Sequence, residues 1–366
     1  MGNRAISIIG TVGVPANYGG FETLVENLVR YHAASSSADT LTVYCSSRSY
    51  PAKPAHFLSA QLKYVPLNAN GAQSIAYDIW SLLSAIWHRH DVILLLGVSG
   101  AIALPLIRLL SSARIVTNID GIEWRREKWQ GMAKRFLRFS ERMAVRYSHE
   151  VVADNEAIAQ YVKREYGRDC HVIAYGGDHA VAVDAVSVDE LNLPARYAFS
   201  VCRIEPENNV HMIVEAFSRQ SDIALVVVGN WNNSEYGRGL RNRYAGMGHL
   251  HLLDPIYDLG KLKTLRSEAD LYLHGHSAGG TNPSLVEAMH FGRLVIAFDC
   301  VFNRCTTEGQ ALFFKTVDEL VGLVVNTDRA TAERVGDSLR EVASRRYTWA
   351  GVARGYFSLL AGHEGC

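Results

Sequence analysis

Short apolar segments alternate with longer amphipathic ones along almost the whole chain of 366 residues. Such alternation predicts strands and helices in turn, which is typical of a parallel sheet covered by helices on both faces. The expected strands are 5–9, 41–45, 92–96, 114–118, 151–153, 197–201, 223–228, 250–252, 271–273 and 294–297. The expected helices are 21–34, 73–87, 101–110, 132–148, 156–166, 210–219, 259–267, 284–291, 317–327 and 329–344.

The alternation pauses near the middle of the chain, at 174–184, where Gly176 and Gly177 can act as a hinge. A chain of this length predicts two domains. We therefore expect an α/β protein with two Rossmann-like, doubly wound parallel-sheet domains and a cleft between them. Sheets of this kind bind ligands at the carboxyl ends of their strands.

Composition excludes several classes of protein. Lys and Arg number 37, as do Asp and Glu, so the formal charges balance. The chain therefore lacks the positive net charge that would indicate nucleic acid as a partner. The six cysteines form no CxxC pair and have no His at metal-like spacing, which favours reduced thiols in the cytoplasm. The N-terminus runs straight into a strand, leaving no room for a signal peptide. The uncharged run 92–107 is too short for a spanning helix and contains three helix breakers, Gly97, Gly100 and Pro105.

The stretch 275–291, GHSAGGTNPSLVEAMHF, contains a glycine-rich loop that opens into a helix. Glycines allow close backbone approach, and the first N–H groups of a helix can face an anion, so the loop predicts a site for a phosphorylated ligand. Pro283 fits the first helical turn, and Glu287 can reach back to accept hydrogen bonds from hydroxyl groups. The alternative is an ordinary strand-to-helix connection with a solvated Glu.

A second glycine loop, GTVGVPANYGGFET, follows the first strand. It lacks the G-x-G-x-x-G spacing of a dinucleotide site, so contact with a sugar phosphate fits better than nicotinamide binding. Asp120 and Glu123 follow the strand 114–118 in the same half. Asp120 can face substrate there, or it can be a turn residue.

The segment 124–146 holds eight basic residues and two glutamates, interleaved with aromatic residues. It can lie on an anionic membrane surface, or it can be a solvated helix face; no RNA-binding module signature accompanies it.

In the second half, Arg203 follows the strand 197–201. It can hold a diphosphate, or it can form a surface ion pair with Glu205 or Glu207.

In this order, the segments resemble the retaining nucleotide-sugar glycosyltransferases of family four, which have the GT-B fold. The resemblance covers nearly the whole chain. It is carried by the first glycine loop, by Arg203 with Glu207 and Asn209 (resembling R-x-x-x-E-K-N), by LLDPIYDLGKL at 252–262, by GGTNPSLVEAM at 279–289 and by YTWAGVARGYFSLL at 347–360. It implies an N-terminal acceptor domain at 1–176, a C-terminal nucleotide-sugar domain at 177–346 and a C-terminal helix at 347–366 that returns to the first domain.

The motifs GVPANYGGFET, NIDGIEW, RIEPENN and HGHSAGGTNPSLVEAM look like a subgroup that contains bacterial β-1,4-rhamnosyltransferases of cell-surface polysaccharide synthesis. The subgroup implies transfer of L-rhamnose from dTDP-rhamnose to a lipid-diphosphate-linked sugar, by an enzyme peripheral to the cytoplasmic membrane leaflet. Two positions depart from the broad family: Gly279 replaces a Glu and Asn208 replaces the diphosphate Lys. Backbone donors are therefore expected to carry more of the phosphate binding.

The resemblance implies roles for individual residues. The catalytic set is Asp120, Arg203 and Glu287. The donor-binding set is Gly13, Tyr18, Gly19, Gly20, Arg203, Asn208, Asn209, Gly229, Pro255, Ile256, Tyr257, Gly280, Thr281, Asn282, Pro283, Ser284 and Glu287. The acceptor or membrane set is Glu123, Trp124, Arg125, Arg126, Lys128, Arg135, Arg138 and Arg142. With no suitable Asp-x-Asp element, no metal or other cofactor is expected. A transferase using a UDP- or GDP-hexose, a sugar-nucleotide epimerase and a non-catalytic nucleotide-sugar-binding protein are the alternatives.

Overall fold

The computed structural model describes residues 3–16, 19–125 and 130–362. The chain divides into two compact units: unit 1 is Met1–Tyr175 with Trp349–Cys366, and unit 2 is Gly176–Thr348. Tyr18, Arg126 and Lys128, which the sequence places in the binding sets, lie outside the described residues.

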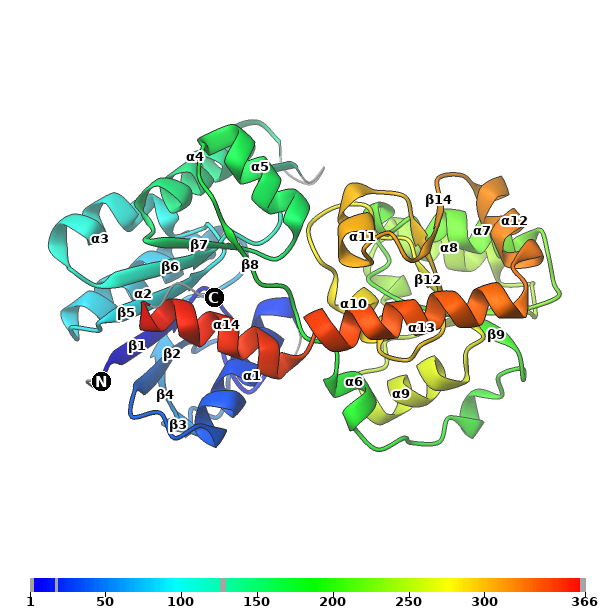
Figure 1. Cartoon of the computed structure of the whole chain (residues 1–366), viewed down its shortest axis with the longest axis horizontal. Helices are drawn as coiled ribbons and strands as arrows, with labels where there is room; N and C mark the ends of the chain where they lie inside the picture. The colour runs from blue at the N-terminus through cyan, green and yellow to red at the C-terminus, as the bar shows by residue number, and fades with distance from the viewer. Residues whose placement is uncertain (1–2, 17–18, 126–129, 363–366) are drawn as a thin grey trace. The chain divides into compact units, whose positions relative to one another are not determined.

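Unit 1 is built on an eight-stranded sheet, as far as the described residues show, with the order β3-β4-β2-β1-β5-β6-β7-β8. Its strands are β1 (Ala5–Ile9), β2 (Thr40–Ser46), β3 (His56–Phe57), β4 (Ala60–Val65), β5 (Val92–Leu96), β6 (Arg114–Asn118), β7 (Glu150–Ala153) and β8 (His171–Val172). Its α-helices are α1 (Gly20–Ala34), α2 (Ser74–Trp87), α3 (Leu104–Leu110), α4 (Gly131–Tyr147), α5 (Glu156–Tyr166) and α14 (Trp349–Ala361) (Figure 1).

The sheet of unit 1 is parallel except at one edge, where β3 pairs antiparallel with β4. Sequence periodicity predicts neither of these strands. The central strand β5, with the sequence VILLL, is buried along its whole length because helices cover both faces of the sheet. The C-terminal helix α14 packs against α1, β5 and β6, so the expected return of the chain to the first domain is confirmed.

Unit 2 has a six-stranded parallel sheet, counted over described residues, with the order β11-β10-β9-β12-β13-β14. Its strands are β9 (Tyr197–Val201), β10 (Ala224–Val228), β11 (Leu250–Leu253), β12 (Leu271–His274), β13 (Leu294–Phe298) and β14 (Leu312–Phe314). Its α-helices are α6 (His179–Ala182), α7 (Val210–Ser218), α8 (Glu235–Tyr244), α9 (Leu259–Glu268), α10 (Pro283–Met289), α11 (Val301–Thr306), α12 (Val317–Asn326) and α13 (Arg329–Arg346).

Each sheet has a switch point, where the strand order reverses direction. In unit 1 it lies between β1 and β5, and in unit 2 between β9 and β12. Loops on the two sides of a switch point diverge, which leaves a crevice at the carboxyl ends of the strands where α/β proteins bind their ligands. The first glycine loop follows β1, and the 275–282 loop follows β12. Both predicted loops therefore begin at a switch point.

Gly10 begins the first glycine loop and has a backbone that requires glycine. Its φ is +94°, and an added Cβ would lie 1.9 Å from the carbonyl oxygen of Leu96. We expect Gly10→Ala to lower the free energy of unfolding by about 2 kcal/mol, measured by urea denaturation.

Gly167→Ala is the matched control for Gly10→Ala. Gly167 also has positive φ, +70°, and lies in the same unit, but no atom lies within 4 Å of its added Cβ. Only the left-handed backbone then opposes the substitution, and we expect a loss of about 1 kcal/mol. Equal losses in the two variants would show that the contact with Leu96 does not matter.

Candidate functional site

The carboxyl edge of the unit 2 sheet gathers most of the predicted donor residues. Because its strands are parallel, the segments that follow them meet at one edge. Arg203 follows β9, Gly229 follows β10, Pro255, Ile256 and Tyr257 follow β11, and Gly280, Thr281, Asn282, Pro283, Ser284 and Glu287 follow β12. We call this edge, with its loops 203–209 and 275–282, the unit 2 site.

The two loops on either side of the switch point are joined by hydrogen bonds. Ser277 donates from its backbone N–H and from its hydroxyl to the carbonyl oxygen of Glu207, at 2.9 and 2.8 Å. The Asn209 amide donates to the carbonyl oxygen of Gly275 at 2.9 Å. A Cβ on Gly275 would lie 2.1 Å from the backbone oxygen of Asn208, so only glycine allows this approach. The loops therefore form one surface.

Asn208 is the residue at the position of the family's lysine, and its side chain is only 3% exposed as part of this junction. Its Nδ2 donates to the carbonyl oxygen of Arg203 at 2.7 Å, and its Oδ1 lies 2.6 Å from Nδ1 of His276. Asn208 and Asn209 thus use their amides to hold the loops together. His276 is absent from the residues predicted by sequence, although it lies in the quoted motif.

The N-terminus of α10 differs from the expectation that its first N–H groups face an anion. The Asn282 side chain caps the helix by accepting from the Ser284 N–H at 3.0 Å, and its carbonyl accepts from the Leu285 N–H at 3.1 Å. Pro283 has no N–H. The first turn has therefore already used these donors. Gly279, with φ of +93°, and Gly280 lie in the half-buried loop before it.

Glu287 lies one turn inside α10 in a charged cluster, with its side chain 17% exposed. Its Oε2 accepts a hydrogen bond from the guanidinium of Arg266 on α9, and its Oε1 lies 3.3 Å from Nε2 of His179. Burial alone would raise the pKa of Glu287, but the charges of Arg266 and His179 hold it below its ordinary value. The carboxylate is therefore ionised and fixed in position.

Arg266 was not predicted by sequence reasoning. Its side chain is 4% exposed, and its Nε has no hydrogen-bond partner among the described residues. The one available signal was its place four residues after Leu262, on the buried face of α9. A basic residue on an apolar face needs a partner, but the sequence does not identify Glu287 as that partner.

Arg203 points its charge at the solvent edge of the unit 2 site. Its side chain is 41% exposed and lies 3.6 Å from Glu205, which is one of the ion pairs that the sequence allows. Exposed pairs at this distance contribute little to stability. An anionic ligand can therefore replace Glu205 as the partner of this guanidinium.

The segment after β11, residues 255–257, presents a largely apolar surface that we call the ledge. Tyr257 is 69% exposed, Pro255 is exposed and Ile256 is half-buried. Gly229, at the end of the neighbouring strand, packs so closely that an added Cβ would lie 2.6 Å from the carbonyl oxygen of Cys202. The aromatic ring of Tyr257 is the side chain here that can stack on a planar ligand.

The first glycine loop, in unit 1, is held by a carboxylate of α1. Glu22 accepts from the Val12 N–H at 2.8 Å and from the Thr11 hydroxyl at 3.1 Å. Gly13 is buried, and an added Cβ would lie 2.7 Å from Sγ of Cys45, which gives this glycine a packing role of its own. Gly19 and Gly20 are half-buried. Sequence reasoning missed Glu22, although it lies within the quoted stretch GTVGVPANYGGFET; its place in the first turn of α1 was the available signal.

Asp120 follows β6 in an uncommon backbone conformation. Its φ is +59°, and its N–H donates to Oδ1 of Asn118 at 2.7 Å, while the Asn118 amide donates to the Tyr356 hydroxyl of α14 at 2.6 Å. A non-glycine residue with positive φ costs free energy and is found often at functional sites. The buried Asp154 follows the neighbouring strand β7. Burial is the main cause that raises the pKa of Tyr175, and the carboxylates of Asp120 and Asp154 raise it further.

The predicted basic segment forms the short helix η3 (Glu123–Arg125) and α4. The Trp124 ring lies in a cluster of cations, with Arg125, Lys134 and Arg138 between 5.2 and 5.6 Å from its centre. The Trp124 Nε1–H donates to the buried Glu141 at 3.4 Å, and Glu141 also accepts hydrogen bonds from Tyr166 and Tyr161 at 2.6 and 2.7 Å. Burial raises the pKa of Glu141. Trp124 is therefore packed within unit 1.

The outer face of α4 carries arginines and apolar side chains together. Arg135, Arg142 and Arg146 are exposed, as are Met132 and Phe139. A pocket of about 820 Å³ is lined by Arg135, Arg138, Phe139, Arg142, Val145, Arg146, Glu165, Tyr166 and Arg168. We call this surface the arginine face of α4. Among the described residues, no helix is both long and apolar enough to cross a membrane.

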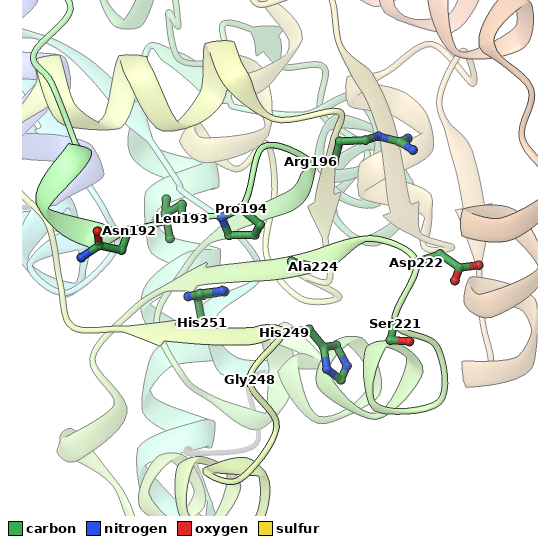
Figure 2. A pocket seen from close by; sticks show the side chains of 10 residues that line it. All are labelled: Asn192, Leu193, Pro194, Arg196, Ser221, Asp222, Ala224, Gly248, His249 and His251. Carbon is green, nitrogen blue, oxygen red and sulfur yellow. The ribbon is translucent and has the colours of Figure 1, made fainter.

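A second pocket, of about 550 Å³, lies at the opposite edge of unit 2, beside the amino ends of β9, β10 and β11 (Figure 2). Its residues include His249, His251 and Arg196. His249 binds the carbonyl oxygen of Phe217 at 2.9 Å, and Arg196 pairs with Asp270 at 2.8 Å. His249 and Arg196 therefore already have partners, so they are useful positions for control substitutions.

Comparison with known families gives two matches. Residues 187–315 match the family described as glycosyl transferases group 1, and residues 3–178 match a domain of unknown function, DUF1972. Phosphatidyl-myo-inositol mannosyltransferase from Mycolicibacterium smegmatis is 28% identical over 223 residues, covering 56% of each chain. The enzyme of the same name from Mycobacterium tuberculosis is 28% identical over 229 residues, covering 57% of this chain and 59% of the relative. The match spans little more than half the length of these relatives.

Solved structures share the fold over nearly the whole chain. Sucrose-phosphate synthase from Thermosynechococcus elongatus has a TM-score of 0.82 at 17% identity, covering 98% of this chain and 99% of that one. Anabaena HepE, in complex with UDP and glucose, has a TM-score of 0.71 at 15% identity, covering 98% and 100%. At such identities the likeness concerns the fold alone.

Proposed function

We propose that the protein is a retaining, metal-independent glycosyltransferase, because residues 187–315 match the group 1 glycosyl transferases and the chain has the GT-B fold. The observation that carries this proposal is the unit 2 site, where loops 203–209 and 275–282 join at the switch point of the sheet. A nucleotide sugar is the ligand that suits an exposed guanidinium, a glycine loop, a fixed carboxylate and an aromatic ledge in one place.

Each part of the unit 2 site has a role in this proposal. Arg203 neutralises the leaving diphosphate, together with backbone donors of Gly280, Thr281 and Asn282. Glu287 accepts hydrogen bonds from the ribose hydroxyls, and its ionised state suits an acceptor-only role. The ledge at Pro255–Tyr257 flanks the base. Gly13, Tyr18, Gly19 and Gly20 remain proposed contacts of the sugar phosphate.

The proposed reaction breaks the bond between C1 of the sugar and the diphosphate oxygen. The acceptor oxygen forms the new bond to C1 on the same face, through an oxocarbenium-like state. The acceptor proton passes to the leaving phosphate oxygen. In this scheme Asp120 orients the acceptor or sugar hydroxyl, and its ability to take up the proton is not required.

We further propose L-rhamnose from dTDP-β-L-rhamnose as the sugar, and a lipid-diphosphate-linked saccharide of bacterial surface polysaccharide assembly as the acceptor. The rhamnose assignment rests on the sequence motifs. A lipid-linked acceptor has the added support that the mycobacterial relatives are, by name, transferases acting on a phosphatidylinositol lipid.

A donor panel tests the proposed function. The protein is incubated with dTDP-rhamnose, UDP-glucose and GDP-mannose in separate reactions, each with synthetic lipid-diphosphate glucose or N-acetylglucosamine, and products are read by mass spectrometry. Rhamnosyl transfer supports the full proposal. Transfer only from another nucleotide sugar keeps the transferase and removes rhamnose. Conversion of a donor without acceptor would indicate an epimerase, and binding without turnover a non-catalytic protein.

The arginine face of α4 is proposed to hold the protein at the cytoplasmic membrane leaflet. Cations near an anionic surface contribute about 1 kcal/mol each, and exposed Met132 and Phe139 can enter the interface. We expect charge reversal of Arg135, Arg138 and Arg142 to Glu to weaken binding to phosphatidylglycerol vesicles at least tenfold, measured by co-sedimentation.

The control for this charge reversal changes the same number of charges on α13. Arg334, Arg340 and Arg345 are exposed there, and their reversal to Glu should change vesicle binding far less. Equal binding by wild type and the α4 variant would remove the membrane role of this face.

A further inference from the structure

We propose that His276, held by Asn208, supplies in its protonated form the second side-chain cation that binds the donor's diphosphate. The inference rests on the proposed function and deepens it. Resembling enzymes use a lysine at the position of Asn208, and this chain has an uncharged, buried amide there. A leaving diphosphate faced by Arg203 as its main cation would be under-neutralised, and His276 is the side chain that the amide orients.

The hydrogen bonds of Asn208 determine which nitrogen of His276 carries a proton. The carbonyl oxygen of Arg203 can only accept, so the group 2.7 Å from it is the NH₂ of Asn208. The amide oxygen therefore faces Nδ1 of His276, at 2.6 Å. Because this oxygen is itself only an acceptor, Nδ1 must donate. Nε2 is then the nitrogen at which the ring gains or loses its proton.

Nε2 of His276 faces the glycine-rich loop. It lies 3.4 Å from the position that a Cβ on Gly279 would occupy. The ring is half-buried, whereas Asn208 behind it is buried, so a ligand can reach the ring from the loop side. The carbonyl oxygen of His276 accepts from Nδ2 of Asn303 at 2.8 Å, which holds the backbone of this residue in place.

Among the described residues, three segments bring charged or titratable groups to the neighbourhood of His276. Loop 203–209 brings Arg203, Glu205 and Glu207, and α11 begins beside Cys300, whose thiol contacts the His276 carbonyl. On β12, the ring of His274 lies 6.1 Å from that of His276. Burial holds the pKa of His274 well below its ordinary value, so His274 stays neutral and does not repel a protonated His276. A bound diphosphate favours the protonated ring.

His276→Gln tests the proposal, because glutamine keeps an amide donor for Asn208 but cannot carry charge. We measure binding of dTDP and UDP to the full chain by calorimetry from pH 6 to pH 8.5, with magnesium absent. Wild type should bind more weakly as pH rises through the titration of the ring. At pH 6 the variant should bind about tenfold more weakly than wild type, because it lacks one charge-assisted hydrogen bond. Its binding should not weaken further as pH rises.

His249→Gln is the control, because His249 lies at the opposite edge of the same sheet and its ring binds a backbone carbonyl oxygen, that of Phe217. It should bind as wild type does. A merely structural role of His276 would weaken binding equally at every pH, and that result would overturn the proposal, as would equal binding by His276→Gln and wild type. If wild type binds neither nucleotide, the proposed function itself is contradicted.

Discussion

Arg203→Ala should lower kcat by two to three orders of magnitude. The guanidinium acts on charge that develops on the leaving diphosphate, and removal of one such donor costs other enzymes about 10²-fold to 10³-fold in rate. Arg203 is exposed and its ion pair with Glu205, at 3.6 Å, is long, so folding should not depend on it. Steady-state kinetics at saturating donor give kcat, and circular dichroism checks the fold.

Arg196→Ala is the matched control for Arg203→Ala. The two arginines flank the same strand, β9, at opposite ends, and each has an acidic partner: Asp270 for Arg196 and Glu205 for Arg203. Arg196→Ala should leave kcat within about twofold of wild type, because the amino edge of the sheet takes no part in the proposed chemistry. Retained activity in Arg203→Ala would contradict the assignment of Arg203.

Arg266→Met should lower the free energy of unfolding by about 3 kcal/mol, because it leaves the ionised Glu287 among buried neighbours without its main partner. Glu287→Met should also be costly, since it leaves the guanidinium unpaired. The double variant removes both charges and should recover much of the loss. Urea denaturation of the four proteins gives the coupling energy, which we expect to exceed about 2 kcal/mol.

The pH dependence of this coupling follows from the pKa of Glu287. A carboxyl whose pKa is lower in the folded chain binds fewer protons there than in the unfolded chain. Its stabilising contribution is therefore complete above the ordinary value of 4.5 and is lost as pH falls through the folded pKa. The coupling energy should be larger at pH 7 than at pH 3.5. Losses that simply add at pH 7 would show that Arg266 and Glu287 do not act as a pair.

The sequence predicts the core of both sheets well, for a physical reason. Strands β1, β5, β6 and β9 have the bounds expected from their apolar runs. A strand buried on both faces needs a continuous apolar run, so the end of the run marks the end of the strand. Edge elements lack this signal. The helix α8, EYGRGLRNRY, is absent from the sequence prediction. It buries only Gly237, Leu240 and Tyr244, and its two glycines and four charged residues obscure the apolar periodicity of a helix.

The candidate site is predictable where a motif acts through the backbone and less so where it acts through distant partners. The loop 275–282 was found because glycine and proline have local meanings. Glu287 was found too, but its partner Arg266 lies on another helix, and no spacing connects the two. In the same way, His276 gains its orientation from Asn208, which is 68 residues away in the chain. Only the folded sheet brings such pairs together.

The central claim, retaining transfer without a metal at the unit 2 site, is tested most directly by the anomeric configuration of the product. Purified protein, dTDP-β-L-rhamnose and a lipid-diphosphate glucose acceptor are incubated with excess EDTA, and the new linkage is read by NMR. We predict a β-linked rhamnosyl product formed at the same rate with and without EDTA. An α-linked product, or one that forms only when a divalent metal is supplied, would contradict the account.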